Sequence, residues 1–230
     1  MAELKAVFLD VGGPIYDDEN YVAAVLSALD EVRAADGLGP ADRAVFRVRY
    51  DEVRAAQAGS LRAVLAEEFL GDRARRGELH ERTRRHWVHP AGTLHPDVLP
   101  FLRSLGGQVR VGVLANQEEG VIRALERDGV APYIDVWGVS AIVGFEKPSP
   151  ELFEWCLAEA GVRAAEAVHI GNRLDTDVRP AAALGLATVW VLRGEAAPMP
   201  TAEQLAEPDL AVPSLDGLGP RILSLGEARA

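Results

Sequence analysis

Polar side chains of catalytic type follow four short apolar segments of this 230-residue chain. These residues are Asp10, Asn116, Lys147, Asn172, Asp175 and Asp177. A carboxylate such as Asp10 can attack an electrophile and form a covalent intermediate when a cation neutralises it. Lys147 is a suitable cation that would hold Asp10 ionised, and the acidic loop near Asp177 could add Mg²⁺, which prefers hard oxygen ligands. The residue types therefore predict nucleophilic carboxylate chemistry with Mg²⁺ as cofactor.

The elements that must position these residues predict an α/β fold. The run Ala6–Leu9 shows no polar alternation, which is typical of a strand buried on both faces of a parallel sheet. Gly12, Gly13 and Pro14 then end the strand. Asp10 is thus expected at the carboxyl end of a buried strand, where ligands bind in open α/β sheets. Further strands are predicted at residues 109–114, 134–140, 167–170, 187–192 and 210–212.

Helical segments divide the chain into a predicted core and a predicted cap. Helices alternating with the strands, at residues 96–105, 118–128, 148–160, 178–184 and 218–225, predict a parallel sheet covered on both faces. Residues 20–89 show only helical spacing, with segments at 20–36, 40–57, 61–70 and 73–88 before a linker at 90–96. We expect a core of residues 1–16 and 93–230, and a helical cap of residues 17–92 that covers the site as a lid.

Composition and charge exclude several function classes. The formal net charge of −11 argues against a general nucleic-acid binder, and no apolar run approaches the length of a membrane span. The first core strand begins almost at the N-terminus, so we expect no signal peptide and a cytoplasmic location. The single cysteine, Cys156, allows no internal disulfide and is expected in the core. The expected partner is a small anionic substrate, with the chain a monomer or a homodimer.

Four segments resemble the motifs of the haloacid dehalogenase-like (HAD) hydrolases that carry a helical, type C1 cap. They are residues 8–15, 111–116, 144–150 and 169–177, and the likeness covers residues 4–215. The resemblance implies a Rossmann-like doubly wound parallel sheet, the HAD core, with an inserted all-helical cap. It also implies a hydrolase with Asp10 as nucleophile, most simply a Mg²⁺-dependent phosphatase acting on a small phosphorylated metabolite. The implied phosphate-binding residues are Asn116, Ala115, Gly12 and Gly13, and the implied metal ligands are Asp10, the Gly12 carbonyl, Asn172, and Asp175 or Asp177.

The chain departs from the family pattern at four positions. Gly12 stands where family phosphatases have an Asp that acts as general acid and base, a function worth ~10²–10⁴ in rate. Tyr16 or Asp17 is our expected substitute, since the loop that follows the first motif, which also holds Asp18, can approach the site. The remaining departures are Pro14 for Thr, Ala115 for Ser or Thr, and Asn172 for Asp.

These departures leave three interpretations. A Mg²⁺-dependent phosphatase of reduced or altered activity is favoured, because Asp10 and Lys147 are both retained. A non-catalytic or regulatory protein on the same fold comes second, because a fold does not determine a function. A metal-free 2-haloacid dehalogenase comes third. Its fourth motif resembles residues 172–175, but the dehalogenase pattern expects an aromatic residue near position 12 and Ser at position 115.

The expected cap contains a basic cluster at residues 82–87. This cluster could attract an anionic substrate, but a solvated helix end is the simpler interpretation. His80, His89 and His95 lack the spacing of metal ligands and are expected at the surface or in the linker. Arg173 is expected to face solvent, as loop arginines usually do.

Overall fold

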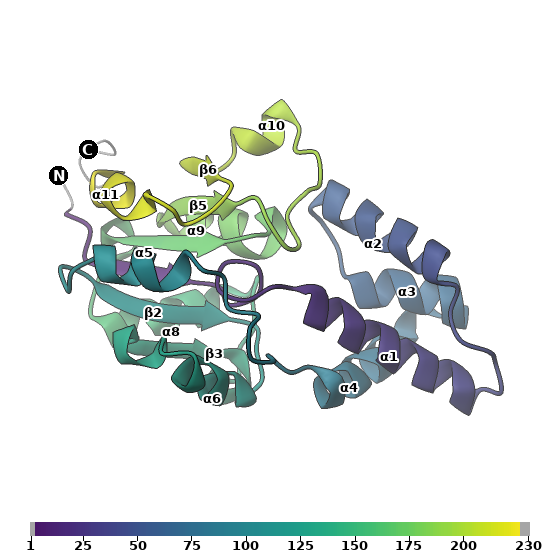
Figure 1. The fold of residues 1–230 in the computed structure, drawn as a ribbon. Helices are drawn as coiled ribbons and strands as arrows, with labels where there is room; N and C mark the ends of the chain where they lie inside the picture. The colour runs from purple at the N-terminus through teal and green to yellow at the C-terminus, as the bar shows by residue number, and fades with distance from the viewer. Residues whose placement is uncertain (1–2, 226–230) are drawn as a thin grey trace.

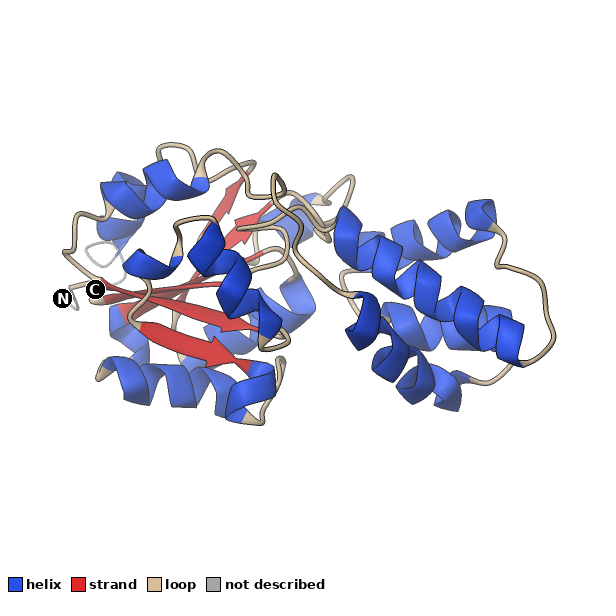
Figure 2. Ribbon diagram, turned by 60° about the horizontal axis from the view of Figure 1, so that its bottom comes forward, coloured by secondary structure: helices blue, strands red, loops and turns tan. Residues whose placement is uncertain are grey.

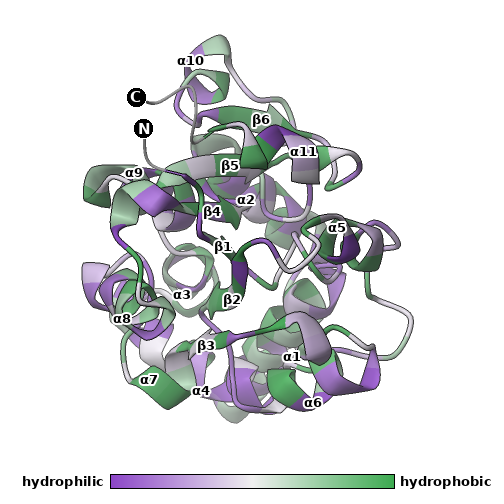
Figure 3. Ribbon diagram, turned by 90° about the vertical axis from the view of Figure 1, so that its left-hand side faces the viewer, coloured by the Kyte–Doolittle hydropathy of each residue, from purple (hydrophilic) through white to green (hydrophobic). Residues whose placement is uncertain are grey.

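The computed structural model describes residues 3–225 and contains one six-stranded, wholly parallel sheet. Its strands are β1 (Ala6–Leu9), β2 (Arg110–Ala115), β3 (Val136–Val139), β4 (Ala167–Gly171), β5 (Ala187–Val191) and β6 (Leu210–Val212). Their order is β3-β2-β1-β4-β5-β6, as seen from bottom to top in Figure 3. The strand order reverses direction between β1 and β4, and at such a point an open α/β sheet forms a ligand crevice at its carboxyl edge. The predicted fold class is therefore confirmed.

Helices cover both faces of this sheet because the strand residues alternate between two cores. Val7 and Leu9 of β1 point into the core covered by α5 (Val98–Ser104), α6 (Gly120–Arg127) and α11 (Leu218–Leu223). Ala6 and Phe8 point toward α8 (Pro150–Ala160) and α9 (Arg179–Leu184). Figure 3 shows these helix groups on opposite sides of the strands. All four residues of β1 are fully buried, as expected of the unalternating apolar run. Asp10, the next residue, is thereby fixed at the edge of the sheet.

The helix bounds follow local capping signals. The α-helices are α1 (Glu19–Ala35), α2 (Arg43–Ala56), α3 (Leu61–Leu70), α4 (Arg76–His86), α5 (Val98–Ser104), α6 (Gly120–Arg127), α7 (Ser140–Val143), α8 (Pro150–Ala160), α9 (Arg179–Leu184), α10 (Ala202–Leu205) and α11 (Leu218–Leu223). The segment predicted as a helix from residue 40 begins later, because the side chain of Asp42 caps it by accepting from the amides of Ala44 and Val45. The short helices α7 and α10 were not expected from the sequence.

Helices α1 to α4 form a separate unit with an apolar core of its own. That core contains Val25 and Leu29 of α1, Phe46 of α2, Leu65 of α3 and Leu79 of α4. Figures 1 and 2 show the unit beyond the carboxyl ends of the strands, joined to the sheet by loops. The insertion between β1 and β2 therefore has the all-helical character predicted for a cap, and we call α1 to α4 the cap from here on.

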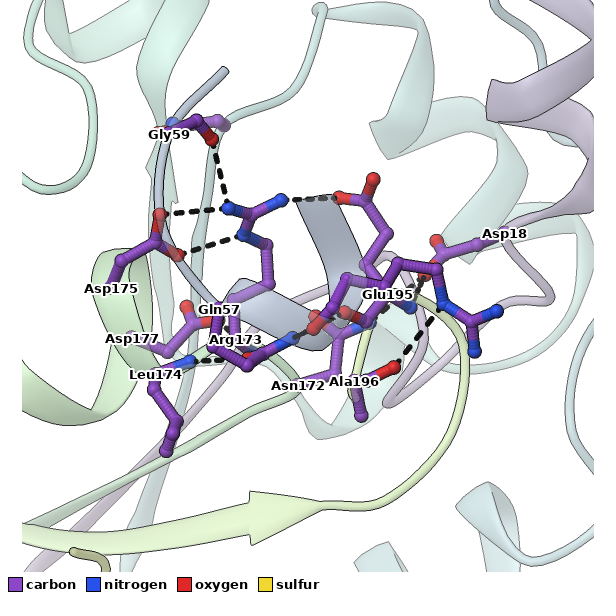
Figure 4. A network of polar contacts seen from close by, with 12 residues as sticks. Asp18, Gln57, Gly59, Asn172, Arg173, Leu174, Asp175, Asp177, Glu195 and Ala196 are labelled. Atoms are coloured by element: carbon purple, nitrogen blue, oxygen red, sulfur yellow. Dashed lines mark hydrogen bonds and ion pairs between the residues drawn. The ribbon is translucent and has the colours of Figure 1, made fainter. Parts of the chain in front are cut away.

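Gln57, which directly follows α2, fastens the cap to the core. Its fully buried side chain accepts from the Leu174 amide at 2.9 Å and donates to the carbonyls of Glu195 and Arg54 at 2.8 and 2.7 Å. Its backbone carbonyl also accepts from Arg179 Nη1 at 3.1 Å. Figure 4 shows Gln57 between the two core loops. These contacts join the end of α2 to the segments that follow β4 and β5.

We expect Gln57→Ala to lower the free energy of unfolding by about 2 kcal/mol, because it leaves the buried Leu174 amide without an acceptor. Chemical denaturation measures the loss, and hydrogen exchange would show faster exchange at the Leu174 amide. Gln108→Ala is the control, because Gln108 is exposed and should change stability by no more than about 0.5 kcal/mol. Equal stability of the two variants would contradict a stabilising role of the hydrogen bonds that join Gln57 to the core.

Among residues 3–225, no helix is both long enough and apolar enough to span a membrane.

Candidate active site

A cavity of ≈ 630 Å³ lies between the cap and the carboxyl edge of the sheet. Its core side is lined by Asp10, Gly12, Asn116, Lys147, Asn172 and Asp175, which are residues predicted from the sequence, together with others. Ala115, Gly13 and Asp177 were also predicted, but they do not line the cavity; all three are buried. The strand ends thus bring most of the predicted residues to one place.

Lys147 connects two carboxylates at the floor of the cavity. Its Nζ lies 2.9 Å from Asp10 Oδ1 and 2.5 Å from Asp177 Oδ1, and its side chain is 2% exposed. Asp177 Oδ1 also contacts His169 Nε2 at 3.0 Å, while Asp177 Oδ2 accepts from the Arg173 amide at 3.0 Å. Both oxygens of Asp177 are therefore occupied by protein groups. Asp177 lies behind Lys147 and holds the ammonium against Asp10.

Burial and charge move the pKa values of these groups in different directions. Burial raises the pKa of Asp10, and the ammonium of Lys147 offsets only part of that rise. Burial would also raise the pKa of Asp177, but Lys147 and His169 outweigh it and hold that pKa below its usual range. Burial disfavours the charged form of Lys147, yet the two carboxylates outweigh this and raise its pKa. Lys147 is therefore protonated at neutral pH.

Asn116 is engaged by the backbone of Lys147. Its Nδ2 donates to the Lys147 carbonyl at 2.9 Å, and its Oδ1 accepts from the Lys147 amide at 2.7 Å. The pair of bonds joins the end of β2 to the loop that carries the ammonium. The Gly13 amide, another predicted phosphate donor, gives its hydrogen to the Tyr16 carbonyl at 2.8 Å. Within residues 3–225, the Gly12 amide makes no such bond, so it is available to an anion beside Asp10.

Asp18 occupies the space beside Gly12. A Cβ atom at position 12 would lie 2.6 Å from Asp18 Oδ1, closer than real Cβ contacts allow. Asp18 Oδ2 accepts from Asn172 Nδ2 at 2.9 Å and from the Glu195 amide at 3.1 Å. Burial, Glu195 and Asp10 all raise the pKa of this carboxyl well above its usual range. Asp18 is thus the carboxyl nearest the position where the family places its second Asp.

The structure corrects the expected substitute for that carboxyl. The Tyr16 hydroxyl donates to Asp128 Oδ2 at 2.8 Å, Asp17 is exposed, and neither residue lines the cavity. The loop after the first motif does reach the site, as expected, but through Asp18. The sequence signal was only the pair of adjacent acids, and tertiary folding decides which of them points inward.

The effect of a substitution at Gly12 on stability should therefore depend on the residue at position 18. We expect Gly12→Ala to cost about 1–3 kcal/mol in unfolding free energy, because the new methyl group overlaps the Asp18 carboxyl. In an Asp18→Ala background the same substitution should cost less than half as much, because the space is then vacant. Urea denaturation of the four proteins in this cycle measures the coupling. An equal cost in both backgrounds would show that the two residues do not compete for space.

The fourth motif contains a buried ion pair rather than a solvent-exposed arginine. Arg173 is 7% exposed, contrary to expectation, because Asp175 accepts two of its hydrogen bonds at 2.8 and 2.7 Å. Arg173 also donates to the Gly59 carbonyl of the cap at 3.0 Å and lies 3.9 Å from Glu195. Figure 4 shows Arg173 at the centre of this network. Asp175 is thus committed to Arg173.

The cap closes the cavity with Tyr21, Arg62, Arg76, His80 and Trp87, among others. His80 therefore belongs to the site, contrary to the surface position expected for it.

Most of the predicted basic cluster is engaged elsewhere. Arg82 pairs with Glu78 at 3.2 Å, and Arg84 pairs with Glu118 at 2.7 Å. Arg85 is exposed and does not line the cavity. The simpler interpretation of that cluster, a charged helix end, agrees with these contacts.

Three oxygen atoms near Asp10 could serve as ligands of a divalent cation. Within the described residues, no hydrogen bond is made to Asp18 Oδ1, Asn172 Oδ1 or the Gly12 carbonyl oxygen. Burial raises the pKa of both Asp10 and Asp18, and the Asp10 charge raises that of Asp18 further. A nearby cation would favour the ionised form of both carboxyls. Oxygen ligands with one or two carboxylates are what Mg²⁺ prefers. No group of three or more acidic, His or Cys side chains arranged for a metal occurs within residues 3–225.

Comparison with known proteins places these motifs in one family. Residues 4–185 match the family described as haloacid dehalogenase-like hydrolase. A glyceraldehyde 3-phosphate phosphatase of Methanopyrus kandleri is 36% identical over 107 residues, which cover 44% of each chain. A phosphoserine phosphatase of Thermus thermophilus is 31% identical over 183 residues, 77% of this chain and 63% of that protein. The chain thus aligns with under half the length of the first of these relatives.

Solved structures share the fold over the whole chain. A HAD phosphatase from Thermococcus onnurineus has a TM-score of 0.63 at 22% identity, covering 95% of this chain and 98% of that one. A predicted phosphoglycolate phosphatase from Haemophilus somnus has a TM-score of 0.70 at 15% identity and covers 100% of both chains. At these identities the likeness concerns the fold. The residues of the cavity must supply the argument about chemistry.

Proposed function

Because the chain belongs to the haloacid dehalogenase-like hydrolases, we propose that it is a phosphatase that transfers the phosphoryl group of a small metabolite to Asp10. One observation carries the proposal: the buried Lys147 ammonium contacts Asp10 at 2.9 Å and is itself held by Asp177 at 2.5 Å. This arrangement keeps a cation beside the nucleophile and beside an incoming phosphate. The phosphatase names of the relatives support the same class of reaction.

In the proposed reaction, an Asp10 oxygen attacks phosphorus, the bond from phosphorus to the substrate oxygen breaks, and that oxygen takes a proton from water to leave as the alcohol. Water then attacks phosphorus in the aspartyl phosphate, which releases phosphate and restores the Asp10 carboxylate. Lys147 neutralises charge on the transferred group, and Gly12, whose amide makes no hydrogen bond within residues 3–225, lines the same cavity. Because position 12 has no side chain, we expect substrates with poor leaving groups to react more slowly than aryl phosphates.

We propose Mg²⁺ as the cofactor of this reaction. The ligands from the protein would be the Asp10 carboxylate, the Gly12 carbonyl and Asn172 Oδ1, with Asp18 supplying the second negative charge. When bound, the ion would shield the repulsion between the carboxylates and the substrate phosphate. Asp175 and Asp177 are not assigned to the metal in this proposal, because Arg173 holds the first and Lys147 with His169 holds the second.

The direct test is hydrolysis of a generic aryl phosphate by the purified protein, with Mg²⁺ and with a chelator. We expect phosphate release that requires Mg²⁺. An aryl leaving group needs little help from a general acid, so the absence of a residue-12 carboxyl would not mask the activity. No release under either condition would overturn the proposal. Halide release from 2-haloacids in the same preparation would instead identify a dehalogenase.

A further inference from the structure

The cap side of the cavity contains two arginines without an ion pair. Arg62 lies in the first turn of α3 and Arg76 begins α4, and both line the cavity opposite the sheet edge. Neither forms a salt bridge or a side-chain hydrogen bond with any residue between 3 and 225. In contrast, Arg75, Arg82 and Arg84 of the same cap are each paired with acids. Of the cap arginines that have no such partner within residues 3–225, Arg62 and Arg76 line the cavity, whereas Arg85 is exposed outside it.

His80 belongs to the same wall. It lies one helical turn after Arg76, so both residues are on one face of α4. Burial and the positive charge of Arg62 lower the pKa of His80, and the negative charge of Glu146 offsets only part of this shift. The Arg62 charge therefore lies near the imidazole. A neutral His80 can donate one N–H to a ligand at neutral pH.

Within residues 3–225, no acidic group of the cavity forms an ion pair with Arg62, Arg76 or His80, although Glu195 lies within electrostatic range of Arg62 and Glu146 within that of His80. Asp175 is held by Arg173 and Glu118 is held by Arg84. Glu195 lies closest to Arg173, at 3.9 Å. The exposed Glu146 makes no ion pair within the described chain. The cap therefore contributes two guanidinium groups without an ion pair to the cavity. In our proposal, the opposite side of this cavity binds phosphate.

We infer that Arg62, Arg76 and His80 form a subsite for a second anionic group of the substrate, a carboxylate or a second phosphate, distal to the phosphate that Asp10 attacks. This inference rests on the proposed function for the orientation of the substrate. Guanidinium groups match both anions in geometry and bind them with charge-assisted hydrogen bonds. A cavity of ≈ 630 Å³ has room for a metabolite that reaches from one side to the other.

Binding to Asp10→Asn tests the subsite without turnover. The ligand pair is 3-phosphoglycerate and glycerol 3-phosphate, which differ by a carboxylate in place of a hydroxymethyl group. By titration calorimetry, we expect the carboxylate compound to bind at least about tenfold more tightly. Fructose 1,6-bisphosphate is the third ligand, and tighter binding of the bisphosphate than of 3-phosphoglycerate would assign the subsite to phosphate.

The arginine variants locate the effect. Added to Asp10→Asn, Arg62→Gln and Arg76→Gln together should remove the preference for the second anion, whereas Arg85→Gln should leave it unchanged. Arg85 is the matched control, because it is an exposed arginine of α4 outside the cavity. Equal affinity for all three ligands, absence of binding, or the same loss in Arg85→Gln would overturn the inference. Failure of the proposed function is separate, because it would appear as no aryl phosphate turnover by the unmodified protein.

Discussion

Asp10→Asn is expected to reduce aryl phosphate turnover by about 10⁴-fold or more, the largest effect of any substitution in this chain. An amide cannot act as the nucleophile, and the loss of a nucleophile removes nearly all of the chemical acceleration. Steady-state phosphate release with saturating Mg²⁺ measures the change.

The same variant should be as stable as the unmodified protein or more stable. Burial raises the pKa of Asp10, so its ionised form costs folding free energy above the folded-state pKa. Replacing the carboxylate by a neutral amide removes that cost at pH 7. Chemical denaturation therefore separates loss of chemistry from loss of structure. Residual activity within tenfold of the unmodified protein would contradict the nucleophilic role of Asp10.

Asp177→Asn is expected to lower the free energy of unfolding by about 3 kcal/mol at pH 7. The substitution keeps the shape of the side chain but leaves Lys147 with one carboxylate and removes the charge that faces His169. Breaking a buried ion pair by removing one partner is costly because the other charge stays buried. Asp10→Asn is the matched control, because it removes the other carboxylate of the same lysine with the opposite expected sign.

The loss of unfolding free energy caused by Asp177→Asn should be smaller at acidic pH than at neutral pH. The pKa of Asp177 is lowered in the folded state, so its contribution is complete above the unfolded-state value of about 3.9 and is lost as pH falls below it. Denaturation at pH 7 and pH 3 should therefore show a smaller difference between variant and unmodified protein at pH 3. If Asp177 were a metal ligand instead, the metal-free protein would lose little stability at pH 7.

The sequence contained enough information to predict the sheet. Apolar runs such as Ala6–Leu9 are typical of strands buried on both faces of a parallel sheet. The observed strands begin and end close to the predicted bounds. The largest difference is at β3, predicted from residue 134 but observed from Val136. Asp10 and Asn116 follow neighbouring parallel strands, whose carboxyl ends share one edge of the sheet. Lys147 lies beyond β3 and α7, and Asn116 binds its backbone at that edge.

The cap side of the site could not be predicted, because it depends on how two separately packed units meet. Asp18 and Arg76 have neighbours in the sequence with the same charge, Asp17 and Arg75, and nothing local distinguishes the one that enters the cavity. Gln57 adopts a left-handed conformation with φ 48° and reaches loops more than 110 residues away. Arg173 was expected in solvent because loop arginines usually face it, but Asp175 and the Gly59 carbonyl hold it in the interior.

A covalent phosphoryl group on Asp10 can be trapped by acid quenching of the protein during turnover of an aryl phosphate with Mg²⁺, followed by peptide mass spectrometry. We expect this group on the peptide that contains Asp10 and expect it to be absent from Asp10→Asn. Lys147→Met, which removes the ammonium but keeps the nucleophile, should show far less of it. Turnover with no phosphoryl group on Asp10, or with the group on another residue, would contradict the assignment of Asp10 as the nucleophile.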